Sequence, residues 1–169
     1  MAVVTRRVEL RSSNNDYDWL GHGIYYWEDD PKRALDWAIR CAKAGTHPIS
    51  DPAVVGAVID LADCLNLIQT EAYALVEEAY RILKTNCETA GEPVPINCGF
   101  VEAARYLDCS VFETLHDDQG KIPFASIRAF FPEGEPVFPG AGIRQRDHIQ
   151  ICVRHPGRIL GHFLPSQGS

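Results

Sequence analysis

Long hydrophobic runs are missing from this chain, and their absence removes one class of protein at once. No stretch of about 18 consecutive apolar residues occurs, so a membrane-spanning helix is not expected. The opening MAVVTRRVELRSS is too polar to resemble a secretory signal. The sequence therefore predicts a protein of the cytoplasm.

Two common binding motifs are absent as well. None of the six cysteines forms a C-x-x-C pair, so a structural zinc site has little support and no metal is expected. Residues 21–23 have no third glycine at dinucleotide-binding spacing and lead into a strand rather than a helix, which excludes a Rossmann site. No cysteine has a local activating signature, so a Cys-His hydrolase is disfavoured.

Positive charge is also scarce. The chain has 16 Lys and Arg against 23 Asp and Glu, a formal net charge of −7, which argues against broad docking on nucleic acid or an anionic membrane. Its length of 169 residues, with 46% apolar residues, suits one globular domain over residues 1–169. No internal repeat or low-complexity segment is visible.

The order of expected elements indicates the fold class. Strands are expected near both ends and helices in the middle: strands at 23–27, 53–61, 124–131, 148–156 and 158–165, and helices at 32–45, about 70–86 and about 100–116. This order favours an α+β fold with a largely antiparallel sheet over alternating β-α units.

The stretch DWLGHGIYYW, residues 18–27, is the most unusual in the chain. Glycine before a β-branched and aromatic run indicates a backbone that comes close to something before it enters a strand. The plain interpretation is a loop that leads into a buried strand, with Tyr25, Tyr26 and Trp27 in the core. The functional interpretation is a binding loop with aromatic platforms.

A family resemblance supports the functional interpretation. DWLGHGIYYWEDDPKRALDWA resembles the glycine-glycine-Ile-Tyr element of ADP-ribosyltransferases of the poly(ADP-ribose) polymerase type. In that element the tyrosine stacks on the nicotinamide of NAD, and a following helix carries a second aromatic residue. The resemblance implies a cofactor-binding loop and its two aromatic platforms: Gly21, His22, Gly23, Ile24, Tyr25 and Trp37.

The C-terminal part has the layout of the family's third catalytic motif. PGAGIRQRD resembles the loop that helps to bind the acceptor, and the strand HIQICV follows it. Gln150 then stands where the family usually has glutamate. His148 lies two residues earlier, so both side chains should face the same side of the strand. It could orient a phosphate, a ribose or the acceptor, or be a half-exposed strand histidine. Arg144 and Arg146 could contact a diphosphate or an acceptor nucleotide, or be solvated loop residues.

The whole order, from about Asn15 to Pro165, resembles small bacterial ADP-ribosyltransferase-like proteins of toxin and phage-defence systems. The resemblance implies a split, mainly antiparallel sheet with a helical insertion, and NAD as co-substrate. It also implies a macromolecular acceptor, protein or nucleic acid, and an antitoxin or immunity protein as partner. Two departures stand out: residues 1–13 lack the family's Tyr-His-Gly-like strand, which is expected to be missing or truncated here, and Gln150 lacks the charge of glutamate.

Three functions are left open by the sequence. The first is an ADP-ribosyltransferase with Tyr25, His148 and Gln150 as catalytic residues. The second is an NAD glycohydrolase that uses the same cleft with water as acceptor. The third is a weak or inactive module of the same fold that binds NAD, ADP-ribose or a partner protein.

Overall fold

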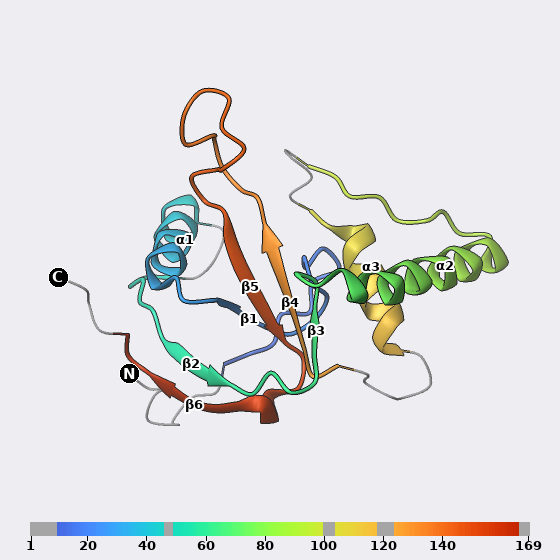
Figure 1. The fold of residues 1–169 in the computed structure, drawn as a ribbon, viewed down its shortest axis with the longest axis horizontal. Coiled ribbons are helices and arrows are strands. Elements are labelled where there is room, and N and C mark those ends of the chain that lie inside the picture. The colour runs from blue at the N-terminus through green and yellow to red at the C-terminus, as the bar shows by residue number, and fades with distance from the viewer. Residues whose placement is uncertain (1–9, 46–48, 100–103, 118–123, 166–169) are drawn as a thin grey trace.

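A four-stranded sheet forms the centre of the protein (Figure 1). The computed structural model describes residues 10–45, 49–99, 104–117 and 124–165. The strands of the sheet lie in the order β1-β5-β4-β3, with bounds Ile24–Trp27, His148–Val153, Ser126–Phe131 and Cys64–Asn66. Strand β5 pairs antiparallel with both β1 and β4, whereas β3 runs parallel to β4. Cys152 and Val153 on β5 are fully buried, so the middle of this strand is the centre of the core.

A two-stranded ribbon covers one face of this sheet. Strand β2 (Gly56–Ile59) pairs antiparallel with β6 (Ile159–Phe163). Ile59 and Ile159 from the ribbon pack against a buried cluster that contains Ile24, Tyr26, Ile151 and Val153. The strand expected at 53–61 is shorter in the structure, where β2 covers only Gly56–Ile59 and Val58 is exposed. A two-stranded ribbon buries only the face that lies against the sheet.

Helix α1 (Pro31–Ala44) follows β1 directly and confirms the helix expected at 32–45. The Oδ1 atom of Asp30 accepts a hydrogen bond from the backbone N–H of Arg33 at 2.8 Å, which satisfies one of the free amides of the first turn. Pro31 occupies the first turn, where its missing N–H is not needed. Gly45 ends the helix in a left-handed conformation with φ of +65°.

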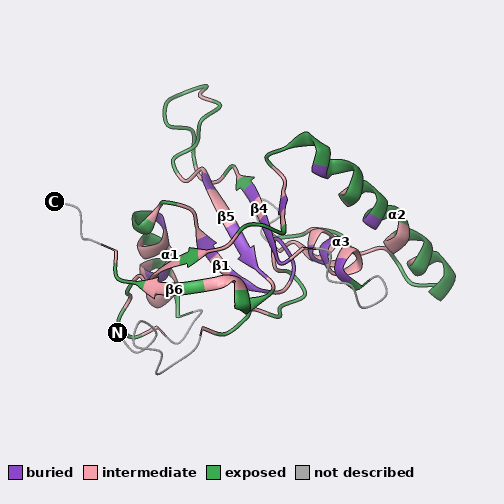
Figure 2. Cartoon of the chain, turned by 60° about the horizontal axis from the view of Figure 1, so that its bottom comes forward, coloured by how far each residue is buried: buried purple, intermediate pink, exposed green. Residues whose placement is uncertain are grey.

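The two remaining helices project from the other side of the sheet (Figure 1). Helices α2 (Tyr73–Ala90) and α3 (Tyr106–Asp117) pack against each other between β3 and β4 in the sequence. Much of α2 is exposed (Figure 2). Leu75 is exposed, whereas Ala72, just before the helix, and Ala79 are buried. Residues 100–103 of the helix expected at 100–116 lie outside the described residues.

The structure thus confirms a mixed α+β fold whose sheets are mainly antiparallel. The helical pair between β3 and β4 lies where a helical insertion was expected. Among the described helices, none combines the length and the apolar character that crossing a membrane requires.

Candidate functional site

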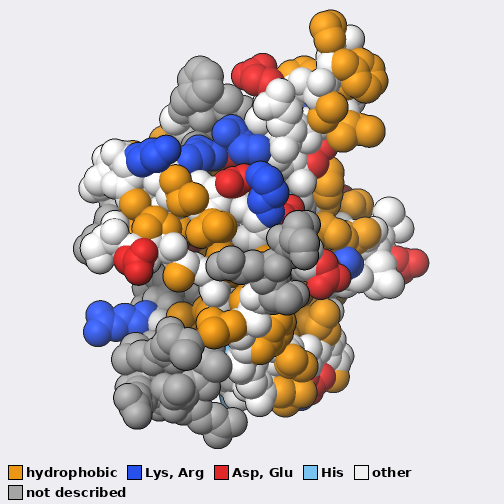
Figure 3. Space-filling view, turned by 90° about the vertical axis from the view of Figure 1, so that its left-hand side faces the viewer, with side chains coloured by type: hydrophobic (Ala, Val, Ile, Leu, Met, Phe, Trp, Pro, Cys, Tyr) orange, Lys and Arg blue, Asp and Glu red, His pale blue; other side chains and the backbone are white. Residues whose placement is uncertain are grey.

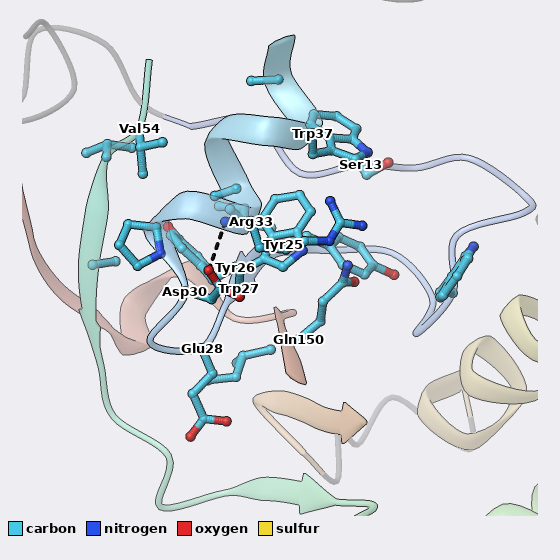
Figure 4. A pocket seen from close by; sticks show the side chains of 18 of the residues that line it. Ser13, Tyr25, Tyr26, Trp27, Glu28, Asp30, Arg33, Trp37, Val54 and Gln150 are labelled. Carbon is cyan, nitrogen blue, oxygen red and sulfur yellow. Dashed lines mark hydrogen bonds between the residues drawn. The ribbon is translucent and has the colours of Figure 1, made fainter. Parts of the chain in front are cut away.

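A large pocket is lined by α1, by β1, by residues 49–59 and by the loop that joins β4 to β5. Its volume is about 1420 Å³, and Tyr25, Trp37 and Gln150 are among the residues that line it. Figure 4 shows Gln150 extending from β5 toward Trp27 and Arg33, with Trp37 on α1 beyond them. Three residues that are far apart in the sequence therefore share one pocket.

The register of β1 against β5 decides which side chains face this pocket together. Trp27 lies opposite Gln150, and Tyr25 lies opposite Cys152. Because directly paired residues of antiparallel strands project from the same face, Tyr25, Trp27 and Gln150 share one face of the sheet. Ile24 projects from the other face, where its side chain packs with Tyr26 in the core under the β2–β6 ribbon. Ile24 is among the residues that line the pocket, but it is buried in this cluster.

Trp27, rather than Tyr25 or Trp37, is the aromatic residue that lies directly opposite Gln150 in the sheet. Its ring centroid is 5.5 Å from that of Trp37, with the planes tilted by 46°. The guanidinium of Arg33 lies over the Trp27 ring, with Cζ 5.8 Å from the centroid. The Trp27 Nε1 atom is buried and has no hydrogen-bond partner among the described residues. Trp37 therefore contacts Trp27, and the two rings form one aromatic wall of the pocket.

Tyr25 holds its own loop in place. Its hydroxyl donates a hydrogen bond to the carbonyl oxygen of Gly21 at 2.6 Å and accepts one from the N–H of Leu20 at 2.8 Å. The side chain is partly buried against the core cluster that contains Cys152. Burial, followed by the neighbouring Cys152, raises the pKa of Tyr25 far above its usual value, so the hydroxyl stays neutral. Tyr25 can offer its ring to a ligand, but its hydroxyl is already used.

His148 and Gln150 form a hydrogen-bonded pair with a definite direction. The Nδ1 atom of His148 lies 2.7 Å from the carbonyl oxygen of Arg146, so Nδ1 carries the hydrogen and donates it. In the neutral ring Nε2 is then an acceptor, and the Nε2 amide of Gln150 donates to it at 2.9 Å. Burial lowers the pKa of His148, which keeps the ring neutral. The Oε1 atom of Gln150 is left as an acceptor, with no partner among the described residues.

This pair yields a prediction for the substitution Gln150→Glu. A carboxylate cannot donate to Nε2 of His148, and its negative charge would stabilise a proton there. The pKa of His148 should therefore rise from below to above its ordinary value of about 6.5. An NMR titration of the imidazole protons in both proteins measures the change. A His148 pKa that stays below that value would mean that the Gln150 amide does not donate to His148.

Gly21 and His22 face helix α3 rather than the pocket. The backbone N–H of His22 donates to Oε1 of Glu113 at 2.8 Å, and its Nδ1 lies 3.3 Å from Oε2. Gly21 has φ of +73°, and a Cβ atom there would collide with the Glu113 carboxylate and lie 2.6 Å from Nη1 of Arg154. Gly21 is thus required by the close approach of the loop to α3.

Gly23 borders the pocket, but the protein uses both of its backbone groups. Its N–H donates to the carbonyl oxygen of Ser13 at 3.0 Å, and its carbonyl oxygen accepts from the Ser13 N–H at 2.8 Å. A Cβ atom at Gly23 would lie 2.5 Å from Sγ of Cys152. Gly21 and Gly23 therefore let the loop pack closely against other parts of the protein. A ligand amide that used Gly23 would have to displace Ser13.

One cluster outside the pocket has the residue types of a metal site. Single atoms of His22, Cys109 and Glu113 lie within 4.8 Å of one another. Arg154 already donates to both carboxylate oxygens of Glu113, at 2.6 and 2.9 Å. Burial favours neutral Glu113, but the bonds from Arg154 and the His22 amide outweigh it and lower the pKa of Glu113. Burial raises the pKa of Cys109 to about 11. The cluster is therefore a neutral thiol beside a satisfied ion pair.

Two residues of the pocket were not selected from the sequence. Trp27 could have been, because alternation along a strand places it on the same face as Tyr25. Arg33 lies four residues before Trp37 on α1, so helical spacing places the two side chains on one face. No local pattern connects either residue with Glu133, whose carboxylate contacts Arg33 in the folded chain.

The chain matches no family model, no curated protein and no solved structure in the comparisons with known proteins.

Proposed function

We propose that this chain is an ADP-ribosyltransferase that binds NAD in the pocket and transfers ADP-ribose to a macromolecule, with the fold of that family. The observation that carries the proposal is the position of Gln150, which lies opposite Trp27 in the sheet and lines the same pocket as Trp27 and Trp37. This arrangement pairs a flat cation-binding surface with a polar acceptor. The first would bind the nicotinamide ring of NAD, and the second would bind a ribose hydroxyl.

NAD suits the surfaces of the pocket. The pocket has a volume of about 1420 Å³ and extends around the edge strand β1, so the space beside Gln150 is one part of it. Nicotinamide in NAD is flat and cationic, and aromatic faces attract such a ring through their electron-rich π systems. Tyr25, Trp27 and Trp37 supply these faces from β1 and α1.

Gln150 would act while positive charge develops on the ribose. The bond between ribose and nicotinamide breaks, its electron pair leaves with nicotinamide, and the ribose carbon becomes cationic. Oε1 of Gln150 would accept a hydrogen bond from a ribose hydroxyl and stabilise that charge through its dipole. The acceptor then adds to the carbon and loses a proton. His148, by binding the Gln150 amide, holds Oε1 toward the pocket and is a positioning residue.

The acceptor and the biological setting extend the proposal. A protein or nucleic-acid acceptor fits a bacterial toxin or defence effector, which would need an antitoxin or immunity protein in its own cell. If water is the acceptor, the same site is an NAD glycohydrolase. Nicotinamide release with and without a cell extract distinguishes the two, because transfer leaves ADP-ribose attached to a macromolecule and hydrolysis leaves it free.

A non-catalytic module is the second candidate function, and two observations favour it. The backbone of Gly23 is occupied by Ser13, and Gln150 carries no charge to stabilise the ribose cation. Such a module would bind NAD or ADP-ribose in the same pocket without releasing nicotinamide. NAD binding without turnover, in a protein with its native fold, would select this function.

The substitution Trp37→Ala tests the binding surface. Losing one aromatic face should weaken NAD binding by about 1–2 kcal/mol, or about 5- to 30-fold in the dissociation constant. Isothermal titration calorimetry measures the change. Trp37→Phe is the matched control and should lose much less, because it keeps an aromatic face. If the unaltered protein does not bind NAD, the proposed function is wrong; if Trp37→Ala binds equally well, the aromatic wall is not the nicotinamide surface.

A further inference from the structure

Three arginines surround a single carboxylate at the edge of the pocket. Oε2 of Glu133 lies 2.5 Å from Nη2 of Arg33. Oε1 lies 3.1 Å from Nε of Arg146 and 3.6 Å from Nη1 of Arg40. Arg33 and Arg40 belong to α1, whereas Glu133 and Arg146 belong to the loop between β4 and β5. All four residues line the pocket.

Arg33 is the unusual member of this group. It is only 5% exposed, and its Nε and Nη1 atoms are buried without a hydrogen-bond partner among the described residues. Its contact with the Trp27 ring supplies no hydrogen-bond acceptor for these N–H groups. Buried N–H groups of an ionised side chain are costly to leave unpaired. Arg33 therefore has unused capacity to donate to an anion.

Three guanidinium groups pair with the same carboxylate, that of Glu133. Two further acids in this region carry negative charge, but both direct their oxygens to backbone N–H groups. Asp30 caps α1, and Asp147 accepts the backbone N–H groups of Glu133 and Arg144. Figure 3 shows a group of Lys and Arg side chains in the upper part of the face turned to the viewer, with Asp and Glu side chains beside them. The protein as a whole is acidic, so three arginines gathered on one carboxylate are not typical of its composition.

We propose that Arg33, Arg40 and Arg146 form a binding site for a phosphoryl group, in which the Glu133 carboxylate is an exchangeable internal counterion. A phosphoryl group has more acceptor oxygens than a carboxylate, and guanidinium forks match its geometry. When Glu133 swings away, the ligand takes its contacts. The proposal rests on the proposed function for placing NAD in this pocket, and it adds a site for a diphosphate, either that of NAD or that of a separate nucleotide.

The test is calorimetric titration with inorganic pyrophosphate at low ionic strength. Glu133→Gln should bind pyrophosphate about tenfold more tightly than the unaltered protein, because the competing charge is gone. Arg146→Gln should bind it about tenfold more weakly, and this residue is exposed enough to replace without loss of the fold. Arg33→Lys should weaken binding as well, because lysine cannot form the planar fork.

The matched control is Asp60→Asn. It changes the net charge by the same amount and weakens the ion pair of Arg158, outside the arginine group. Pyrophosphate affinity should stay unchanged in this variant. Equal tightening in Asp60→Asn and Glu133→Gln would show a general charge effect and overturn the proposal. So would unchanged affinity in Glu133→Gln.

The source of the phosphoryl group follows from competition. If NAD displaces pyrophosphate from the unaltered protein, the site takes the diphosphate of NAD; if both bind together, it takes a second nucleotide. Pyrophosphate binding that responds to Glu133→Gln, in a protein that does not bind NAD, would uphold the arginine site and reject the proposed function. NAD binding in a protein whose pyrophosphate affinity is the same with Glu133→Gln would support the proposed function and reject the arginine site.

Discussion

Alanine in place of Gln150 should slow nicotinamide release about 100-fold, while the NAD dissociation constant changes by less than about threefold. The reason is that the hydrogen bond from Oε1 gains strength only as positive charge develops on the ribose, so it contributes mainly to the transition state. A single polar group of this kind contributes about 10²–10³ to kcat in other enzymes. A nicotinamide-release assay and calorimetric NAD titration of the same preparations measure the two effects.

Gln150→Glu is the matched variant for this experiment. It keeps a hydrogen-bond acceptor at the same position and adds the charge that the resemblance would place there, so its rate should equal or exceed that of the unaltered protein. A loss of NAD binding in Gln150→Ala as large as the loss of turnover would mean that Gln150 contributes equally to the ground and transition states. Unchanged turnover in Gln150→Ala would mean that Gln150 takes no part in the reaction.

Alanine in place of Gly21 should lower the free energy of unfolding by about 2–4 kcal/mol. The left-handed backbone accounts for about 1 kcal/mol of this, and crowding in a packed region costs a further 1–3 kcal/mol. The crowding is specific, because the new Cβ would lie against the carboxylate of Glu113 and near the guanidinium of Arg154. Arg154 is bound to Glu113 through two hydrogen bonds, so neither side chain can move freely. Urea denaturation of the two proteins measures the difference.

Gly45→Ala separates the two contributions. Gly45 has a similar φ of +65°, but a Cβ atom there would meet nothing within 4 Å. This variant should therefore lose only about 1 kcal/mol, the cost of the backbone alone. Equal losses in Gly21→Ala and Gly45→Ala would contradict the close packing of residues 20–23 on α3. In that case the loop would be free to approach a ligand instead.

Much of the fold follows from local patterns. The bounds of α1 are marked by Asp30, Pro31 and Gly45, whose effects act within one helical turn. The stretches SIRAFF and HIQICV form β4 and β5 as expected. Their burial does not alternate, because these central strands are covered on both faces: Ile151, Cys152 and Val153 are all buried. No strand pattern in the sequence marks β3. Its three residues are held in the sheet by pairing with β4.

The sequence alone determined that the fold is α+β, that Gly21 and Gly23 permit a close approach, and that His148 and Gln150 share a face. Only the tertiary structure decided what the glycines approach, which is α3 and β5, and which ring lies opposite Gln150, which is Trp27. It also decided that Glu133 meets Arg33, although 100 residues separate them. Local periodicity fixes which residues share a face of one element. It contains no information about the register or partner across elements, because those depend on how distant surfaces bury each other.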